Sequence, residues 1–75
     1  MDKNDYIYGI RPVMEAIEAG KDIDKVLVKK DLNGDLINEL YDLVKRYRIL
    51  IQRVPLEKIN RITRKNHQGV LAVLS

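Results

Sequence analysis

The apolar residues of this chain recur at two alternating spacings, which predict helices and strands in turn. The clearest spacing is helical, with apolar residues three or four positions apart: Leu36, Ile37, Leu40, Leu43, Val44 and Tyr47. Acidic residues near the start of this repeat and basic residues near its end complement the dipole of a helix. The pattern therefore predicts an amphipathic helix across this stretch.

Proline and glycine positions predict two further helices. Pro12 suits the first position of a helix, Gly20 suits its left-handed end, and Pro55 opens another helix later in the chain. The apolar stripes of these two helices are Val13, Ala16 and Ile17, and then Leu56, Ile59 and Ile62. Both stripes are short, which predicts small helices.

Four short apolar runs predict strands, at residues 6–10, 24–30, 49–51 and 70–74. The second and third runs are apolar at successive positions, which is typical of a central strand buried on both faces. The resulting β-α-β-α-β-α-β order predicts an α/β fold in which helices cover the faces of a parallel or mixed sheet. The expected core is Val26, Leu27, Val28, Leu40, Val44, Ile49, Ile51 and Val70.

Length and composition predict one domain over residues 1–75 in a reduced, cytoplasmic setting. The chain has no cysteine, so it forms no disulfide framework, and a single histidine cannot supply a typical zinc site. It shows neither a secretory signal nor an apolar run long enough for a membrane span, so we expect no membrane partner. The chain ends one residue after an apolar strand, and we expect it to be a piece of a longer protein.

Charge is distributed unevenly along the chain. The net charge is +3, and the stretch from residue 45 to residue 65 contains a single acidic residue, Glu57. The basic residues of that stretch are Lys45, Arg46, Arg48, Arg53, Lys58, Arg61, Arg64 and Lys65. Such a surface favours anionic partners.

The residue types needed for catalysis are sparse. Nucleophilic catalysis needs a Ser, Thr or Cys beside a base, and the chain offers only Thr63, Ser75 and His67. Acidic neighbours such as Asp31 and Asp35 fall in a polar turn and at a helix start, where solvated charge is the ordinary interpretation. No glycine-rich phosphate-binding motif is present. The sequence therefore predicts no active site in this chain.

A polar stretch before the last strand is the better candidate for function. Its cationic and amide side chains are Arg61, Arg64, Lys65, Asn66, His67 and Gln68. Such a set can contact phosphates by charge and 2′-hydroxyls or base edges by hydrogen bonds. The alternative is a solvated loop, and for His67 alone a histidine satisfied by the local backbone.

Arg11 is a second candidate, because a cation at a helix start opposes the dipole unless an anion also binds there. The alternative is that Arg11 reaches into solvent. Tyr6 and Tyr8 could stack on unpaired bases, but packing against the core is the commoner fate of two tyrosines on one strand face.

The two ends of the chain, "YIYGIRPVMEAIEAG" and "NHQGVLAVLS", resemble the signatures of one known domain family. They are similar to the substrate-binding domain of SpoU/TrmH-type RNA 2′-O-ribose methyltransferases. The resemblance implies a three-layer α/β/α sandwich around a four-stranded mixed sheet, like that of RNA-binding ribosomal proteins. It points to Gly9, Arg11, His67, Gln68 and Gly69, with Arg64, Lys65 and Asn66 added by charge and proximity. Relatives often have histidine where this chain has Arg11, which favours a phosphate contact there.

The resemblance also implies an RNA-binding accessory domain that holds ribosomal or transfer RNA, rather than DNA, for a catalytic domain. S-adenosylmethionine is expected in that separate catalytic domain and no cofactor in this chain, which would not be an enzyme by itself. The expected partners are RNA, the protein's own catalytic domain and a second subunit of a homodimer. If the last strand pairs antiparallel with the first, residues 67–69 and 9–11 would meet at one edge of the sheet. The alternative function is a protein-interaction module, which an exposed apolar face on the second helix would favour.

Overall fold

The computed structural model describes residues 5–75, and its elements follow the predicted order. They are β1 (Tyr6–Tyr8), α1 (Ile10–Glu18), β2 (Ile23–Lys29), α2 (Asp35–Arg46), β3 (Leu50–Val54), α3 (Leu56–Ile62) and β4 (Val70–Leu74). None of the helices within residues 5–75 has the length and apolar character to cross a membrane.

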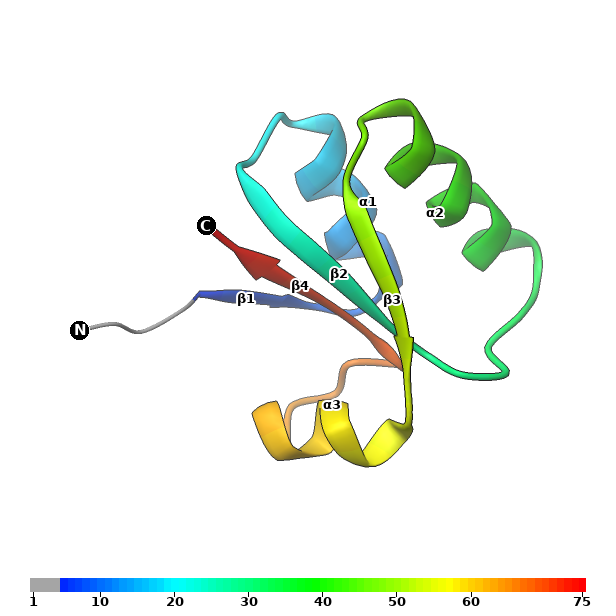
Figure 1. Ribbon diagram of the computed structural model, residues 1–75, viewed down its shortest axis with the longest axis vertical. Helices are drawn as coiled ribbons and strands as arrows, with labels where there is room; N and C mark the ends of the chain where they lie inside the picture. The colour runs from blue at the N-terminus through cyan, green and yellow to red at the C-terminus, as the bar shows by residue number, and fades with distance from the viewer. Residues whose placement is uncertain (1–4) are drawn as a thin grey trace.

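The four strands form one mixed sheet in the order β1-β4-β2-β3. The last strand, β4, lies inside the sheet and pairs antiparallel with both β1 and β2, while β2 and β3 are parallel. β1, β2 and β3 therefore run in the same direction. Their carboxyl ends, the starts of the helices that follow and the start of β4 all meet at one end of the sheet (Figure 1).

Helices cover both faces of the sheet, which confirms the predicted three-layer arrangement. Figure 1 shows α1 and α2 together behind the sheet and α3 by itself near the end where β4 begins, and the core contacts of α3 place it on the opposite face. The core of the first face consists of Val13, Ile17, Val26, Val28, Ile37, Leu40, Leu43, Val44, Val70 and Ala72. The smaller core under α3 consists of Leu27, Val54, Ile59 and Leu71. Adjacent residues of β2 and β4 point to opposite layers and are buried in both, which explains their unbroken apolar runs.

The prediction that residues 49–51 form a central strand was wrong. β3 is an edge strand that begins at Leu50 and pairs only with β2 within the described sheet. Leu50 is 56% exposed, and Ile49 and Ile51 are only partly buried against the first core. The expected core therefore loses these two isoleucines and keeps its other members. Tyr47, which was included in the helical repeat, follows α2 and is 44% exposed.

The first strand and helix also meet earlier than predicted. β1 ends at Tyr8, α1 begins at Ile10, and Pro12 is the third helical residue rather than the first. Gly9 causes this early junction, because its φ of 96° turns the chain out of the strand within one residue. Ile10 therefore belongs to the helix.

Candidate nucleic-acid interface

The two sequence motifs meet in the structure. Tyr8 of β1 lies opposite Leu71 of β4, and beyond this pair the N–H of Gly9 donates to the carbonyl of Val70 at 3.0 Å. This pairing places the Gly9–Arg11 turn beside the turn at Gln68 and Gly69. The predicted meeting of residues 67–69 with residues 9–11 is confirmed.

Close packing explains why glycine stands on both sides of this contact. Gly9 and Gly69 have φ values of 96° and 81°, a region that side chains rarely adopt. A Cβ added at Gly9 would lie 3.2 Å from the side-chain oxygen of Gln68. A Cβ added at Gly69 would lie 3.2 Å from the Cβ of Lys29 and 3.3 Å from a methyl group of Leu32. Both turns therefore favour glycine for its conformation, and a side chain at either position would also have to displace these neighbours by a few tenths of an ångström.

Gln68 connects the turn to the start of α1. Its φ of 54° is left-handed, and its Oε1 accepts a long hydrogen bond of 3.4 Å from the N–H of Ile10. Gly9 has no side chain with which to cap α1, so Gln68, in the neighbouring turn, supplies the acceptor for the first N–H of the helix. Gln68 itself remains exposed.

His67 is buried beneath the loop, with 8% of its surface exposed. Its Nδ1 accepts a hydrogen bond of 2.8 Å from the N–H of Gly69, and its Nε2 lies 2.8 Å from Oδ1 of Asn60. The interpretation of a histidine satisfied by the local backbone is confirmed for Nδ1. The partner of the other nitrogen, Asn60 on α3, was missed. His67 therefore braces the loop from beneath, and its neighbours form the exposed surface.

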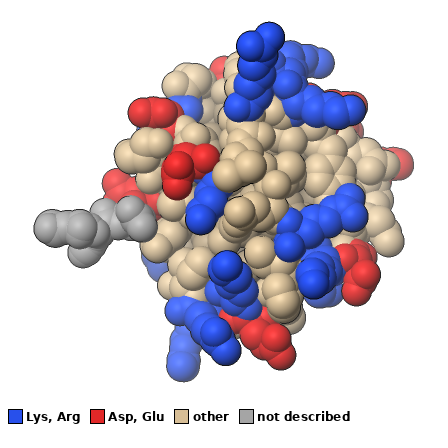
Figure 2. All heavy atoms as spheres, viewed as in Figure 1, with Lys and Arg blue, Asp and Glu red and all other residues tan. Residues whose placement is uncertain are grey.

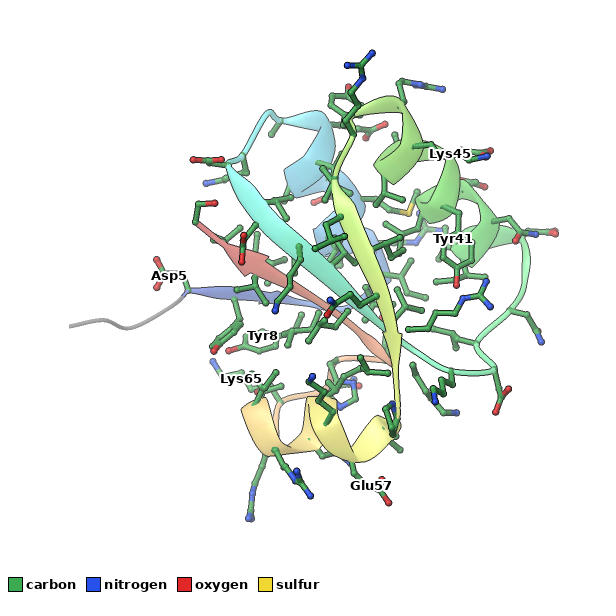
Figure 3. All side chains as sticks on the ribbon, in the orientation of Figure 1. Asp5, Tyr8, Tyr41, Lys45, Glu57 and Lys65 are labelled. Carbon is green, nitrogen blue, oxygen red and sulfur yellow. The ribbon has the colours of Figure 1, made fainter. Side chains whose placement is uncertain are left out.

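Lys65 lies against β1 rather than extending freely into solvent. Its ammonium is 5.3 Å from the centre of the Tyr8 ring (Figure 3). Its backbone N–H donates to the hydroxyl of buried Thr63 at 3.0 Å. Tyr6 and Tyr8 pack against the core under α3, with ring centres 6.4 Å apart. Packing was the commoner fate expected for these tyrosines, and it is confirmed.

Two shallow hollows lie beside the loop. One, of about 720 Å³, is lined by Glu57, Asn60, Arg61, Ile62, Thr63 and Arg64. The other, of about 540 Å³, is lined by Tyr8, Gly9, Ile10, Arg11, Pro12, Leu36, Asn66 and Gln68. The structure thus groups the exposed candidates into a pair of arginines on α3 and its C-terminal loop, and a second set around the start of α1.

The basic surface is discontinuous on the face that Figure 2 draws. Figure 2 shows several separate groups of Lys and Arg side chains, one of them around α3, with uncharged surface between them. Two further cations beside the loop were not predicted. They are Lys29, whose backbone N–H donates to the carbonyl of Gly69 at 2.8 Å, and its exposed neighbour Lys30. The signal for both was a basic pair at the end of a buried strand. Within residues 5–75, no cluster of His, Asp or Glu could hold a metal ion.

The fold and the loop define the class: a small α/β domain whose mixed sheet carries a basic, amide-bearing loop at one end. A family model described as RNA 2′-O ribose methyltransferase substrate binding matches residues 6–75. The chain belongs to this family of substrate-binding domains.

Named relatives agree with this assignment. The chain is 36% identical over 69 residues to a TrmH family tRNA/rRNA methyltransferase of Staphylococcus saprophyticus, and 35% identical to one of Staphylococcus aureus. Each alignment covers 92% of this chain, which spans 28% of the length of these relatives.

Two solved structures share the fold at low sequence identity. A protein with unknown function from Bacillus halodurans has a TM-score of 0.77 at 21% identity, covering 93% of this chain and 71% of that one. An archaeal translation termination factor has a TM-score of 0.65 at 20% identity, covering 92% of this chain and 19% of the factor. At these identities the likeness concerns the fold alone.

Proposed function

We propose that this chain holds the RNA substrate of an RNA 2′-O-ribose methyltransferase and that a separate domain performs the methyl transfer. The family match over residues 6–75 carries the proposal. The relatives named as tRNA/rRNA methyltransferases support transfer or ribosomal RNA as the partner. S-adenosylmethionine then binds the catalytic domain rather than this chain. Besides RNA, the partners of this chain are that catalytic domain and a second copy of the protein, in the cytoplasm.

The loop supplies chemistry suited to an RNA strand. Arg61 and Arg64 line one hollow and Arg11 lines the other, with Lys65 exposed between β1 and α3. Each cation can neutralise a phosphate, while the amides of the loop can reach 2′-hydroxyls and base edges. Separate cationic points suit a flexible single strand, which can bend from one to the next.

The alternative of a protein-docking module has weaker support. The apolar residues of α2 are buried or partly buried, so the helix lacks the exposed apolar face that would have favoured docking. Docking against a catalytic domain remains compatible with RNA binding, because the two activities need different surfaces.

Titration with single-stranded RNA tests the proposal. If four cations each neutralise one phosphate, log K against log salt falls with a slope of about −3. Raising the salt fourfold, from 50 to 200 mM, then weakens binding about 50-fold. Filter binding at the two salt concentrations measures both quantities. Absence of saturable binding at the lower concentration would refute the proposed function.

A further inference from the structure

The carboxamide of Asn60 has a fixed orientation, which follows from the backbone of the loop. The N–H of Gly69 can only donate, so Nδ1 of His67 must be the acceptor, and in the neutral ring the proton lies on Nε2. Nε2–H then donates to Asn60, so the atom that faces the histidine is the amide oxygen. The NH₂ group of Asn60, an exposed residue, is left to donate outward.

The carboxamide of Gln68 is oriented by the same logic. The N–H of Ile10 can only donate, so the side-chain atom of Gln68 that faces it is Oε1. The NH₂ group of Gln68 is therefore on the other side of the carboxamide, and the side chain is exposed. The side-chain oxygens of Asn60 on α3 and Gln68 in the turn before β4 thus accept hydrogen bonds from the protein itself. Their NH₂ groups can donate to a ligand.

Each amide lines one of the two hollows beside the loop. Asn60 shares the first with Arg61 and Arg64, and Gln68 shares the second with Arg11. Arginine side chains have only donors to offer. Glu57 also lines the first hollow, and among the described residues no acidic side chain lines the second. The arginines and the two oriented amides therefore bring donors to both hollows, beside the hydroxyls of Thr63 and Tyr8 and the carboxamide of Asn66, which can donate or accept.

We propose that the oriented amides of Asn60 and Gln68 make this loop select unpaired nucleotides whose base edges present carbonyl oxygens, so that uridine is preferred to cytidine. The inference rests on the RNA binding proposed above and adds the base that is preferred. The two bases share O2 and differ in opposite senses at N3 and at position 4, so the proposal places the amide donors at position 4, where uracil presents the acceptor O4 and cytosine an amino donor. A donor that meets an amino group leaves both groups unpaired, whereas O4 accepts from it.

Oligouridylate and oligocytidylate of equal length test the selection, because they differ in the base edge and carry the same phosphate charge. At neutral pH we expect the protein to bind oligouridylate about 3- to 10-fold more tightly, with equal salt slopes, since one or two neutral hydrogen bonds separate the two ligands. Equal affinity for both would overturn the selection and leave RNA binding intact. Binding to neither at 50 mM salt would overturn the proposed function as well.

Two variants assign the preference to these amides. Asn60→Asp and Gln68→Glu keep the oxygen that accepts from His67 or Ile10 and replace the outward NH₂ by a second oxygen. The added charge weakens binding to both oligonucleotides, so the measured quantity is the ratio of their affinities. We expect each variant to lower this ratio and the double variant to bring it close to one. An unchanged ratio in the double variant would overturn the assignment.

Gln52→Glu is the matched control, because it makes the same chemical change at an exposed amide of β3 that lines neither hollow. It should leave the ratio unchanged. The ¹⁵N resonances of the His67 ring test the orientation of the Asn60 amide without RNA. We expect the neutral ring to carry its proton on Nε2. Protonation at Nδ1 instead would overturn the assigned direction of the Asn60 amide.

Discussion

The ammonium of Lys65 lies 5.3 Å from the ring centre of Tyr8, so a cation of the loop is attached to the first strand of the sheet. Such a contact contributes about 0.5–1 kcal/mol at an exposed site. The loop is therefore connected to β1 by this contact, next to the hydrogen bond that Gly9, after β1, donates to Val70 at the start of β4. Arg64, the residue before Lys65, lines the hollow beside α3.

Reversing the charge of Arg64 and Lys65 together should weaken RNA binding regardless of sequence. If two of four phosphate contacts are lost, the slope of log K against log salt flattens from about −3 to about −1.5. The thermal midpoint should fall only slightly, because exposed charges contribute little to stability. Filter binding at two salt concentrations and a thermal melt measure the two effects.

The double variant Lys21→Glu with Arg48→Glu provides the control. Both residues are exposed and lie at the opposite end of the sheet, where α1 and α2 finish. The control changes the net charge by the same amount and should retain most of the salt slope. Equal effects of the two double variants would show that net charge, rather than this loop, binds RNA.

Truncating Leu40 to alanine should destabilise the domain strongly. Leu40 is fully buried between α2 and the sheet, and removal of such a side chain costs about 2–5 kcal/mol. Leu50→Ala on β3 should cost less than about 1 kcal/mol, because that side chain is largely exposed. Thermal or urea melts of the two variants measure the difference, and similar midpoints would contradict the described core.

Gly69→Ala and Gly20→Ala separate backbone strain from crowding. Both glycines have φ near 80°, and an added Cβ meets no atom within 4 Å at Gly20. Gly20→Ala should therefore cost only the strain, about 1–2 kcal/mol. At Gly69 the contacts with Lys29 and Leu32 should add about 1–3 kcal/mol. Urea melts measure both, and equal losses would indicate that the two turns are not packed as described.

Removing the His67 side chain should loosen the loop. His67→Ala leaves the buried N–H of Gly69 without its acceptor, which costs about 1–3 kcal/mol. His67→Asn should recover part of this loss, because its side-chain oxygen can take the place of Nδ1. Amide hydrogen exchange at Gly69 reports on this bond directly. Exchange at Gly69 as slow in the alanine variant as in the original chain would contradict the bracing role.

The chain should not bind S-adenosylmethionine by itself. Its sequence contains no glycine-rich cofactor loop, and the proposed function assigns the cofactor to a separate catalytic domain. Isothermal titration calorimetry of the 75-residue chain with the cofactor checks this. Saturable binding would contradict the proposed division between substrate and cofactor domains.

Element order, the layers and most of the core were predictable from the sequence because local spacing determines them. Val26, Leu27 and Val28 are buried as expected, since β2 has a neighbouring strand on each side and helices on both faces. The apolar triplet at residues 49–51 resembles that run, yet β3 lies at the sheet edge. Local pattern does not encode which strand is central, because that depends on pairing between distant segments.

The candidate site was predictable as a location and less so in its roles. Pairing of the first and last strands was sufficient to place Gly9 beside Gln68. The brace between Asn60 and His67 was not predictable, because it depends on how α3 packs over the sheet. Histidine and the cations were conspicuous by type, whereas Asn60 resembles any exposed polar residue of a helix. Whether these residues contact RNA remains a prediction.

The interior position of β4 determines when the domain can fold during synthesis. Among the described strands, β1 pairs only with β4, and Tyr6 lies opposite Val73 across almost the whole chain. During synthesis, β1 therefore has no strand to pair with until β4 has left the exit tunnel of the ribosome. Closure of so long a loop is slow compared with local helix formation. We expect α2 to form early, and the sheet to assemble in one late step after residue 74 emerges.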